Sequence, residues 1–204
     1  NPIWHYYKSR FQINNQNEKE AFLSINKAIE LSDKKSFYIA ERGNLYRAFK
    51  KYDLAKKDFN EAMKLDSNLA STYHYQILLF KEKTQIQEAI KFGEQTRAKF
   101  KNDTIANYLL GEIYLEQKNY LKSLKYFNIA LSIMEYDSSY QTEDQEIKKV
   151  YLSNTYQKVG EVYQLLGDKE LPKEYYIKAL EALKDEIRPD KVLKEKELQG
   201  LIKL

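Results

Sequence analysis

Few side chains of this sequence have the types and spacing that catalysis or metal binding requires. Histidine occurs only at His5 and His74, and cysteine is absent. The sequence has neither a His-Glu-x-x-His zinc motif nor a Gly-rich phosphate loop. Without cysteine there are no disulfides, thiolate nucleophiles or Cys-ligated metals. We therefore expect no catalytic residues, no metal and no cofactor, and we expect both histidines to be ordinary rings rather than metal ligands.

The carboxylates also lack a pattern that indicates acid–base chemistry. Asp and Glu are scattered, often three or four residues from a lysine, as with Glu61 and Lys64. This spacing is typical of ion pairs on the solvent-facing side of a helix. The sequence therefore predicts a protein that is not an enzyme.

Composition narrows the class further. Of the 204 residues, 43% are hydrophobic and 31% are charged, which is typical of a folded globular chain. Six glycines and three prolines are too few for a strand-rich fold of this length, so helices are favoured. The net charge of +4 is too small to indicate nucleic-acid binding, and no apolar run is long enough to span a membrane.

The location of the protein stays open at this stage. The sequence begins at Asn1 rather than at Met, so we expect a preceding segment that is absent here. That segment could be a signal peptide, a lipoprotein leader or a trimmed end, and a cytoplasmic and an exported location are equally compatible with it.

Two stretches of the chain follow one template. Gly111 follows Gly43 by 68 residues, which is twice 34. The first stretch consists of Gly43, Tyr46, Ala55, Phe59 and Ala62. The second consists of Gly111, Tyr114, Ser123, Phe127 and Ala130. A fixed period of this size predicts stacked helical hairpins.

In the first hairpin of this template, we expect a helix from Ser36 to about Phe49, with Ser36 as its N-cap. Residues 50–53 make the turn. The second helix then carries an apolar stripe at i, i+4 and i+7, which packs against its partner.

The spacing and residue types resemble the tetratricopeptide repeat family. Arg42 replaces the usual Leu and Ser67 the usual closing Pro, while Gly93 and Thr96 stand where Phe and Ala are expected. The resemblance implies an all-α fold in one domain, a right-handed superhelix of about five hairpins followed by a C-terminal capping helix. The expected units are residues 1–35, 36–69, 70–103, 104–141 and 142–186, with the capping helix at 187–204.

Three regions depart from the regular period. In the leading repeat, Trp4, Tyr7 and Phe11 are assigned to the first helix, with one extra residue in the turn. Fifteen additional residues around 133–146 predict a longer second helix in the unit 104–141, a short loop at 136–140, and a longer first helix in the unit 142–186. Pro172 is expected in the first turn of a helix capped by Asp168.

In the capping helix, which begins at about Pro189, the apolar residues are Val192, Leu193, Leu198, Leu201 and Ile202.

The resemblance also implies where a ligand would bind. In this family the first helix of each hairpin lines a concave groove that holds extended peptides or helices. By register, the candidate peptide-binding residues are Tyr6, Phe37, Asn44, Arg47, His74, Tyr75, Tyr108, Glu112 and Lys158. The alternative for the aromatic residues among them is that they only pack neighbouring helices together.

The leading hypothesis is a non-catalytic scaffold that binds a protein or peptide in this groove. The alternative is a ligand-sensing or regulatory module of a larger signalling or transcription-regulating chain. RNA binding is disfavoured because Glu41, Glu112 and Glu161 lie on the inner face. A clamp for the acidic termini of chaperones is disfavoured because only Asn44 of its residues is present. Self-association stays open.

Overall fold

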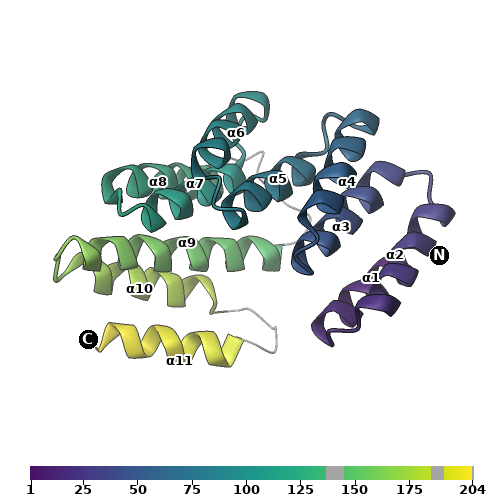
Figure 1. Ribbon diagram of the computed structural model, residues 1–204. Coiled ribbons are helices and arrows are strands. Elements are labelled where there is room, and N and C mark those ends of the chain that lie inside the picture. Colours follow the sequence, from purple (N-terminus) through teal and green to yellow (C-terminus); the bar gives the residue numbers. More distant parts are fainter. Residues whose placement is uncertain (137–144, 185–190, 204) are drawn as a thin grey trace. The chain divides into compact units, whose positions relative to one another are not determined.

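The computed structural model describes residues 1–136, 145–184 and 191–203, and these form eleven α-helices and no strand (Figure 1). The first six are α1 (Pro2–Asn14), α2 (Glu18–Leu31), α3 (Lys35–Ala48), α4 (Tyr52–Leu65), α5 (Ala70–Glu82) and α6 (Ile86–Lys99). The remaining five are α7 (Thr104–Glu116), α8 (Tyr120–Tyr136), α9 (Gln145–Leu165), α10 (Leu171–Ala182) and α11 (Lys191–Ile202). The expected all-α repeat fold is confirmed.

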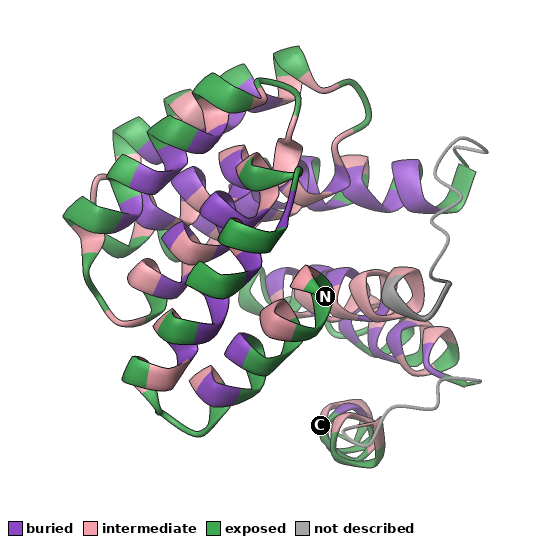
Figure 2. Cartoon of the chain, turned by 90° about the vertical axis from the view of Figure 1, so that its right-hand side faces the viewer, coloured by how far each residue is buried: buried purple, intermediate pink, exposed green. Residues whose placement is uncertain are grey.

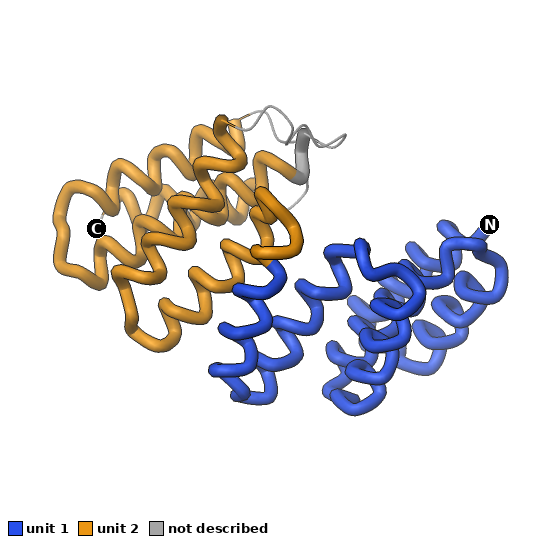
Figure 3. Tube along the Cα trace, turned by 90° about the horizontal axis from the view of Figure 1, so that it is seen from above, with its two compact units in different colours: residues 1–96 blue, residues 97–204 orange. Residues whose placement is uncertain are grey.

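The chain divides into two compact units, residues 1–96 and 97–204 (Figure 3). In the first unit, α1 packs on α2, α3 on α4, and α5 on both α3 and α4. In the second, α7 packs on α8 and α9 on α10, while α8 also contacts α9 and α10 contacts α11. The prediction of a single domain with the unit boundaries given above stays a prediction.

The turn inside each hairpin contains one residue with a left-handed backbone. The φ angles are 55° at Gln16, 58° at Lys50, 57° at Thr84 and 56° at Lys118, and these four residues are spaced by 34. Gly167, with φ of 83°, holds the same place in the fifth hairpin. In every case the following residue donates its backbone N–H to a carbonyl of the preceding helix five residues earlier in the chain. This arrangement satisfies carbonyls that the end of the helix would otherwise leave without partners.

A glycine in the first helix allows the second helix to approach closely. A Cβ atom added to Gly43 would stand 2.6 Å from Cε1 of Phe59, so no side chain fits there. The equivalent pairs are Gly111 with Phe127 and Gly160 with Tyr176. Phe59 and Phe127 are fully buried, so these pairs form the centres of their hairpins.

The irregular hairpin of α5 and α6 carries this pair in the opposite order. Ile77 stands at the position of Gly43, and Gly93 at the position of Phe59. Both residues are buried. The large side chain has moved to the first helix and the small one to the second, so the sum of the two side-chain volumes is largely kept.

The replacement of the family's Leu by Arg42 has a structural partner. The guanidinium of Arg42 donates from Nε and Nη2 to the two carboxylate oxygens of Asp58, at 2.7 and 2.9 Å. Asp58 on α4 is buried, and Arg42 also donates to Asn26 on α2 at 3.0 Å. Polar contacts of Arg42 therefore link α2, α3 and α4 at a position where the family usually has an apolar leucine.

The leading repeat differs from the expectation. Its turn spans residues 15–17, as long as the turn at 49–51, so there is no extra residue. Ser9 and Gln12, not the aromatic residues, are buried at the positions of Gly43 and Tyr46. Trp4, Tyr7 and Phe11 are 57%, 64% and 68% exposed. Trp4, Tyr7 and Phe11 do lie in α1, and only the expected extra turn residue is wrong, because Gln12 rather than an aromatic residue holds the position of Tyr46.

Two expected caps are also corrected. The helix expected from Ser36 begins at Lys35, and its N-cap is Lys34, whose N–H donates to Ser32 Oγ. Pro172 does lie in the first turn of α10, but the N-cap is Glu170. Asp168, two residues before this cap, still accepts hydrogen bonds from the backbone N–H groups of Glu170 and Leu171.

The extra residues of the hairpins α7–α8 and α9–α10 lengthen their helices. α8 has 17 residues and α9 has 21, compared with 14 in α2 and α4. The expected loop at 136–140 falls, after Tyr136, outside the described residues, as does Pro189. In α11, Leu198 is buried against Tyr176 and Leu183 of the last hairpin. Val192 and Leu193, expected to join it, are 57% and 71% exposed.

Buried residues follow the facing sides of the paired helices, and exposed residues the outer sides (Figure 2). The core of each unit therefore runs between helices rather than around one centre. Of the helices described, none combines the length and the apolar character that a membrane span requires.

Candidate functional site

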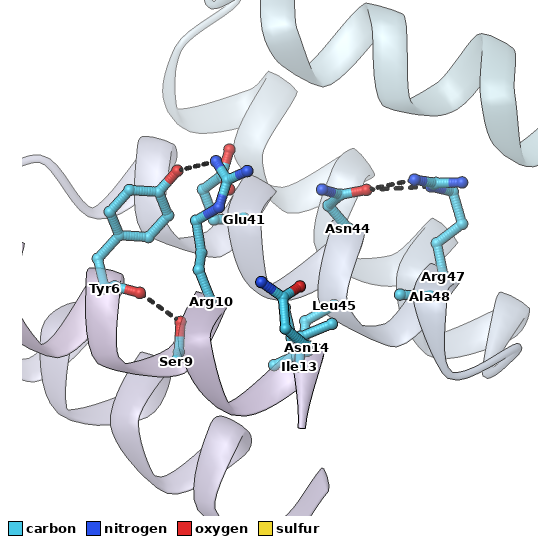
Figure 4. A pocket seen from close by; sticks show the side chains of 10 residues that line it. All are labelled: Tyr6, Ser9, Arg10, Ile13, Asn14, Glu41, Asn44, Leu45, Arg47 and Ala48. Atoms are coloured by element: carbon cyan, nitrogen blue, oxygen red, sulfur yellow. Dashed lines mark hydrogen bonds between the residues drawn. The ribbon is translucent and has the colours of Figure 1, made fainter. Parts of the chain in front are cut away.

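A small polar cavity lies between the first two hairpins of the first unit (Figure 4). Its volume is about 200 Å³. The α1 and α3 helices supply its walls, with Tyr6 and Arg10 on one side and Glu41, Asn44 and Arg47 on the other. Three of the residues predicted from register, Tyr6, Asn44 and Arg47, are brought together here.

One half of this cavity is a network of tyrosines around a carboxylate. Arg10 Nη1 donates to Tyr6 Oη at 2.9 Å, and Tyr75 Oη donates to Glu41 Oε1 at 2.6 Å. Glu41 is only 7% exposed, so its hydrogen bond to Tyr75 offsets part of the cost of burying its charge. Burial, followed by the negative charge of Glu41, raises the pKa of Tyr75 far above its usual value, so its phenol stays protonated.

The other half is built by Asn44 and Arg47 on α3. Arg47 donates to Asn44 Oδ1 from Nε at 3.0 Å and from Nη2 at 2.7 Å. The same guanidinium pairs with Glu82 at the end of α5. These contacts fix the position of the Asn44 amide, whose nitrogen donates to none of the described residues.

Aromatic rings continue from the cavity toward the start of α3. Tyr6 contacts Phe37 edge-on, with 5.4 Å between ring centroids, and the two rings also line a second cavity of about 780 Å³. Phe37 packs at the same time against the core formed by α2 and α3. Its ring therefore belongs both to the surface and to the packing between hairpins.

Two predicted residues on α5 lie deeper than a groove position requires. His74 is 8% exposed and borders neither of the two cavities above. Tyr75 stacks on the buried Phe59, with 5.9 Å between centroids. Its hydroxyl donates to Glu41, so Tyr75 does not line the cavity but holds a residue that does.

The second unit has its own cavity between the hairpins α7–α8 and α9–α10, with a volume of about 310 Å³. The predicted residues Glu112 and Lys158 line it, together with Glu161. Lys158 Nζ lies 2.8 Å from Glu161 Oε2. Tyr108 donates to Glu112 at 3.4 Å, and burial followed by the charge of Glu112 raises the pKa of its phenol.

Register did not identify Arg10 and Glu82. Arg10 follows Tyr6 by four residues and so shares its side of α1, which could have placed it at the site. Glu82 at the end of α5 gave no signal of its own. Within the described ranges, no three His, Asp or Glu side chains gather as a metal site would require. What the cavity offers is fixed hydrogen-bond donors and acceptors, which suit the polar groups of a peptide.

The family model for the tetratricopeptide repeat matches the chain three times, at residues 38–69, 105–134 and 153–182. Each match covers one hairpin with its glycine–aromatic pair. The chain is a tetratricopeptide repeat protein. This fold is typical of scaffolds for protein–protein interaction, and members of the family are generally not catalytic.

Solved structures agree with this assignment. TTC0263, a thermophilic tetratricopeptide repeat protein of Thermus thermophilus, is 10% identical, with a TM-score of 0.72 and full coverage of both chains. The type IV pilus biogenesis factor PilW is 16% identical, with a TM-score of 0.65, over 99% of this chain and 86% of its own. YrrB, described as having an unusual peptide-binding site, is 17% identical, with a TM-score of 0.52, over 98% of this chain and 92% of its own. No curated protein sequence matches significantly. At these identities the likeness concerns the fold alone.

Proposed function

We propose that this tetratricopeptide repeat protein is a non-catalytic scaffold whose first helices bind an extended segment of a partner protein. The observation that carries the proposal is the Asn44 amide in the cavity between α1 and α3. Its oxygen is held by Arg47, and its nitrogen is directed to no described residue. An amide held in this way can donate to a carbonyl group of a peptide backbone.

The surrounding groups support a peptide rather than a small molecule. At about 200 Å³, the cavity is smaller than the roughly 300–1,000 Å³ usual for small-molecule sites. Tyr6 adds a ring at its edge, and Arg10 and Arg47 add positive charge. Such a site can hold one or two residues of a longer segment, whose other residues contact the flanking helices.

The cavity of the second unit offers charged groups to the same class of ligand. Glu112, Lys158 and Glu161 present charges of both signs at its wall. Such charges fix the register of a bound peptide more than they add to its affinity. Among the structural relatives, YrrB is described as a peptide-binding protein of this fold, which supports the proposed class of ligand.

The test is a selection of random twelve-residue peptides on the immobilised full chain, followed by affinity measurements for the selected peptides. We expect the double variant Asn44→Ala, Arg47→Ala to lose about tenfold or more in affinity, because two polar contacts are removed. The control is Leu121→Ala, an exposed residue of α8 whose replacement should leave affinity unchanged. If all selected peptides bind the double variant as well as they bind the wild type, this groove is not the binding site.

A further inference from the structure

A second surface lies on α1 outside the polar cavity, and two of its residues, Ile3 and Tyr7, also border the second cavity. Ile3, Trp4, Tyr7 and Phe11 recur at helical spacing and are all more than half exposed. Four large apolar side chains on one face of a helix form an apolar stripe whose exposure to water is unfavourable. We call these four residues the α1 stripe.

The repeat register indicates what this face is built to contact. In the later first helices, the positions equivalent to Trp4 and Phe11 are all buried. For Trp4 they are Tyr38, Thr72, Ala106 and Thr155, and for Phe11 they are Leu45, Leu79, Ile113 and Val162. α1 alone among these five helices presents the same positions as exposed aromatic rings.

Where the packing of these positions is described, the second helix of the preceding hairpin covers them. Tyr38 and Leu45 pack against Ala21, Ile25 and Ala28 of α2. Likewise Leu79 packs against Ala55 and Phe59 of α4, and Val162 against Phe127 and Ala130 of α8. The surface that fits this face is therefore a helix with a small, a large and a small residue at i, i+4 and i+7.

The charge nearest Trp4 is positive, whereas Asp33 and Asp66 lie beside Ile3 and Tyr7 at the second cavity. Lys8 lies over the Trp4 ring, 5.2 Å from its centroid, and α1 contains no Asp or Glu. Desolvation lowers the pKa of His5 most, and the positive charges of Lys8 and of Lys27 on α2 lower it further. A helix docked here would gain from acidic residues beside its apolar stripe.

The described second helices of a second copy do not offer such a surface. In these helices the residues of the small–large–small pattern are already buried inside the chain, as Ala21, Ala55 and Ala130 illustrate. Two α1 helices facing each other would bring their lysine and arginine side chains together, and α1 itself contains no acidic residue.

We propose that the α1 stripe is a docking surface for an amphipathic helix of a partner protein, with acidic residues flanking a small–large–small apolar stripe. The helix would pack on α1 as α2 packs on α3. This surface is separate from the peptide cavity, so a partner bound here would leave Asn44 and Arg47 accessible.

Trp4 is the only tryptophan of the chain, so its fluorescence reports directly on this surface. The probe is a synthetic peptide with the sequence of residues 17–32, capped at both ends and carrying Lys19→Glu and Lys27→Glu. Added to the full chain, it should shift the Trp4 emission to shorter wavelength in a saturable manner, because the indole leaves water. The same peptide with Ile25→Asp should bind about tenfold more weakly or worse, since the large central contact is lost.

The protein variant Tyr7→Glu, Phe11→Glu keeps Trp4 and alters only exposed side chains, so it should fold and lose the shift. Leu121→Glu, at a residue 76% exposed on α8, is the matched control and should keep it. The proposal is overturned if the emission does not change, or if the double variant responds like the wild type. It is also overturned if the emission shifts with protein concentration alone and sedimentation shows a dimer, which would make a second copy the occupant.

Discussion

The ring of Phe59 lies so close to Gly43 that a methyl group on the glycine would stand 2.6 Å from the ring and 3.1 Å from Cβ of Asp58. The ring is fully buried, so it can withdraw only by displacing its neighbours. The same close contact between a glycine and an aromatic ring occurs in two further hairpins, where it sets the distance between the two helices. It thereby determines where the inner face of each first helix lies.

The first prediction concerns this contact. Gly43→Ala should lower the free energy of unfolding by about 1–3 kcal/mol, because the added methyl group overfills the hairpin. Gly200→Ala is the matched control, since nothing lies within 4 Å of a Cβ at Gly200 in α11. The control should be neutral or gain up to about 1 kcal/mol from better helix propensity. Urea unfolding measures both, and equal stability of the two variants would contradict the packing described.

The second prediction concerns the left-handed turn residues. Thr84 is β-branched and has φ of 57°, a conformation that costs L-residues with a branched side chain about 1–2 kcal/mol. Thr84→Gly should therefore raise the midpoint of thermal unfolding. Gly167→Thr introduces the same residue at the equivalent turn and should lower it. The two variants should therefore shift the midpoint of thermal unfolding in opposite directions. A lower midpoint in Thr84→Gly would show that the turn is not strained.

The third prediction concerns Arg42 and Asp58. Arg42→Leu restores the family's usual residue but leaves the buried Asp58 carboxylate without its two charged hydrogen bonds. We expect a loss of roughly 1.5–3 kcal/mol in the free energy of unfolding. The double variant Arg42→Leu, Asp58→Asn should recover part of this loss, because no charge remains buried. A double-mutant cycle measures the coupling, and strictly additive effects would contradict the pairing.

The fourth prediction concerns alkaline pH. Burial, followed by the charge of Glu41, raises the pKa of Tyr75 in the folded state, whereas in the unfolded chain it titrates near pH ~10. The stabilisation is therefore complete below about pH 10 and is lost as the pH rises further, because only the unfolded state releases the proton. Tyr75→Phe should reduce the slope of unfolding free energy against pH by up to about 1.4 kcal/mol per pH unit. An unchanged slope would mean that Tyr75 is not shielded from solvent.

The regular part of the fold could be predicted from the sequence because it depends on spacing. Gly43 and Phe59 recur with their period, and the hairpins follow from it. The exchange of Ile77 and Gly93 looked like the loss of a motif residue, although the large and small residues had only changed places. The turn of the first hairpin was misjudged because Phe11 suggests a register one residue short of the observed one, in which the buried Ser9 holds the position of Gly43.

The candidate site could be predicted only in outline. Register placed Asn44 and Arg47 on the inner face, but it could not show that the guanidinium holds the amide oxygen. Such contacts depend on side-chain rotamers and on residues of other helices, such as Glu82. For the same reason register did not distinguish His74, which is buried, from residues that line the cavity.

The central claim is that a partner protein contacts the inner face of the first unit. The most direct measurement places a photo-reactive benzoyl-phenylalanine at Asn44 in the cavity or at Lys57 on the outer side of α4, in the native cell. After irradiation, we predict a covalent adduct with a partner segment from position 44, and no such adduct from position 57. Crosslinking of the same partner from position 57 alone would contradict the account.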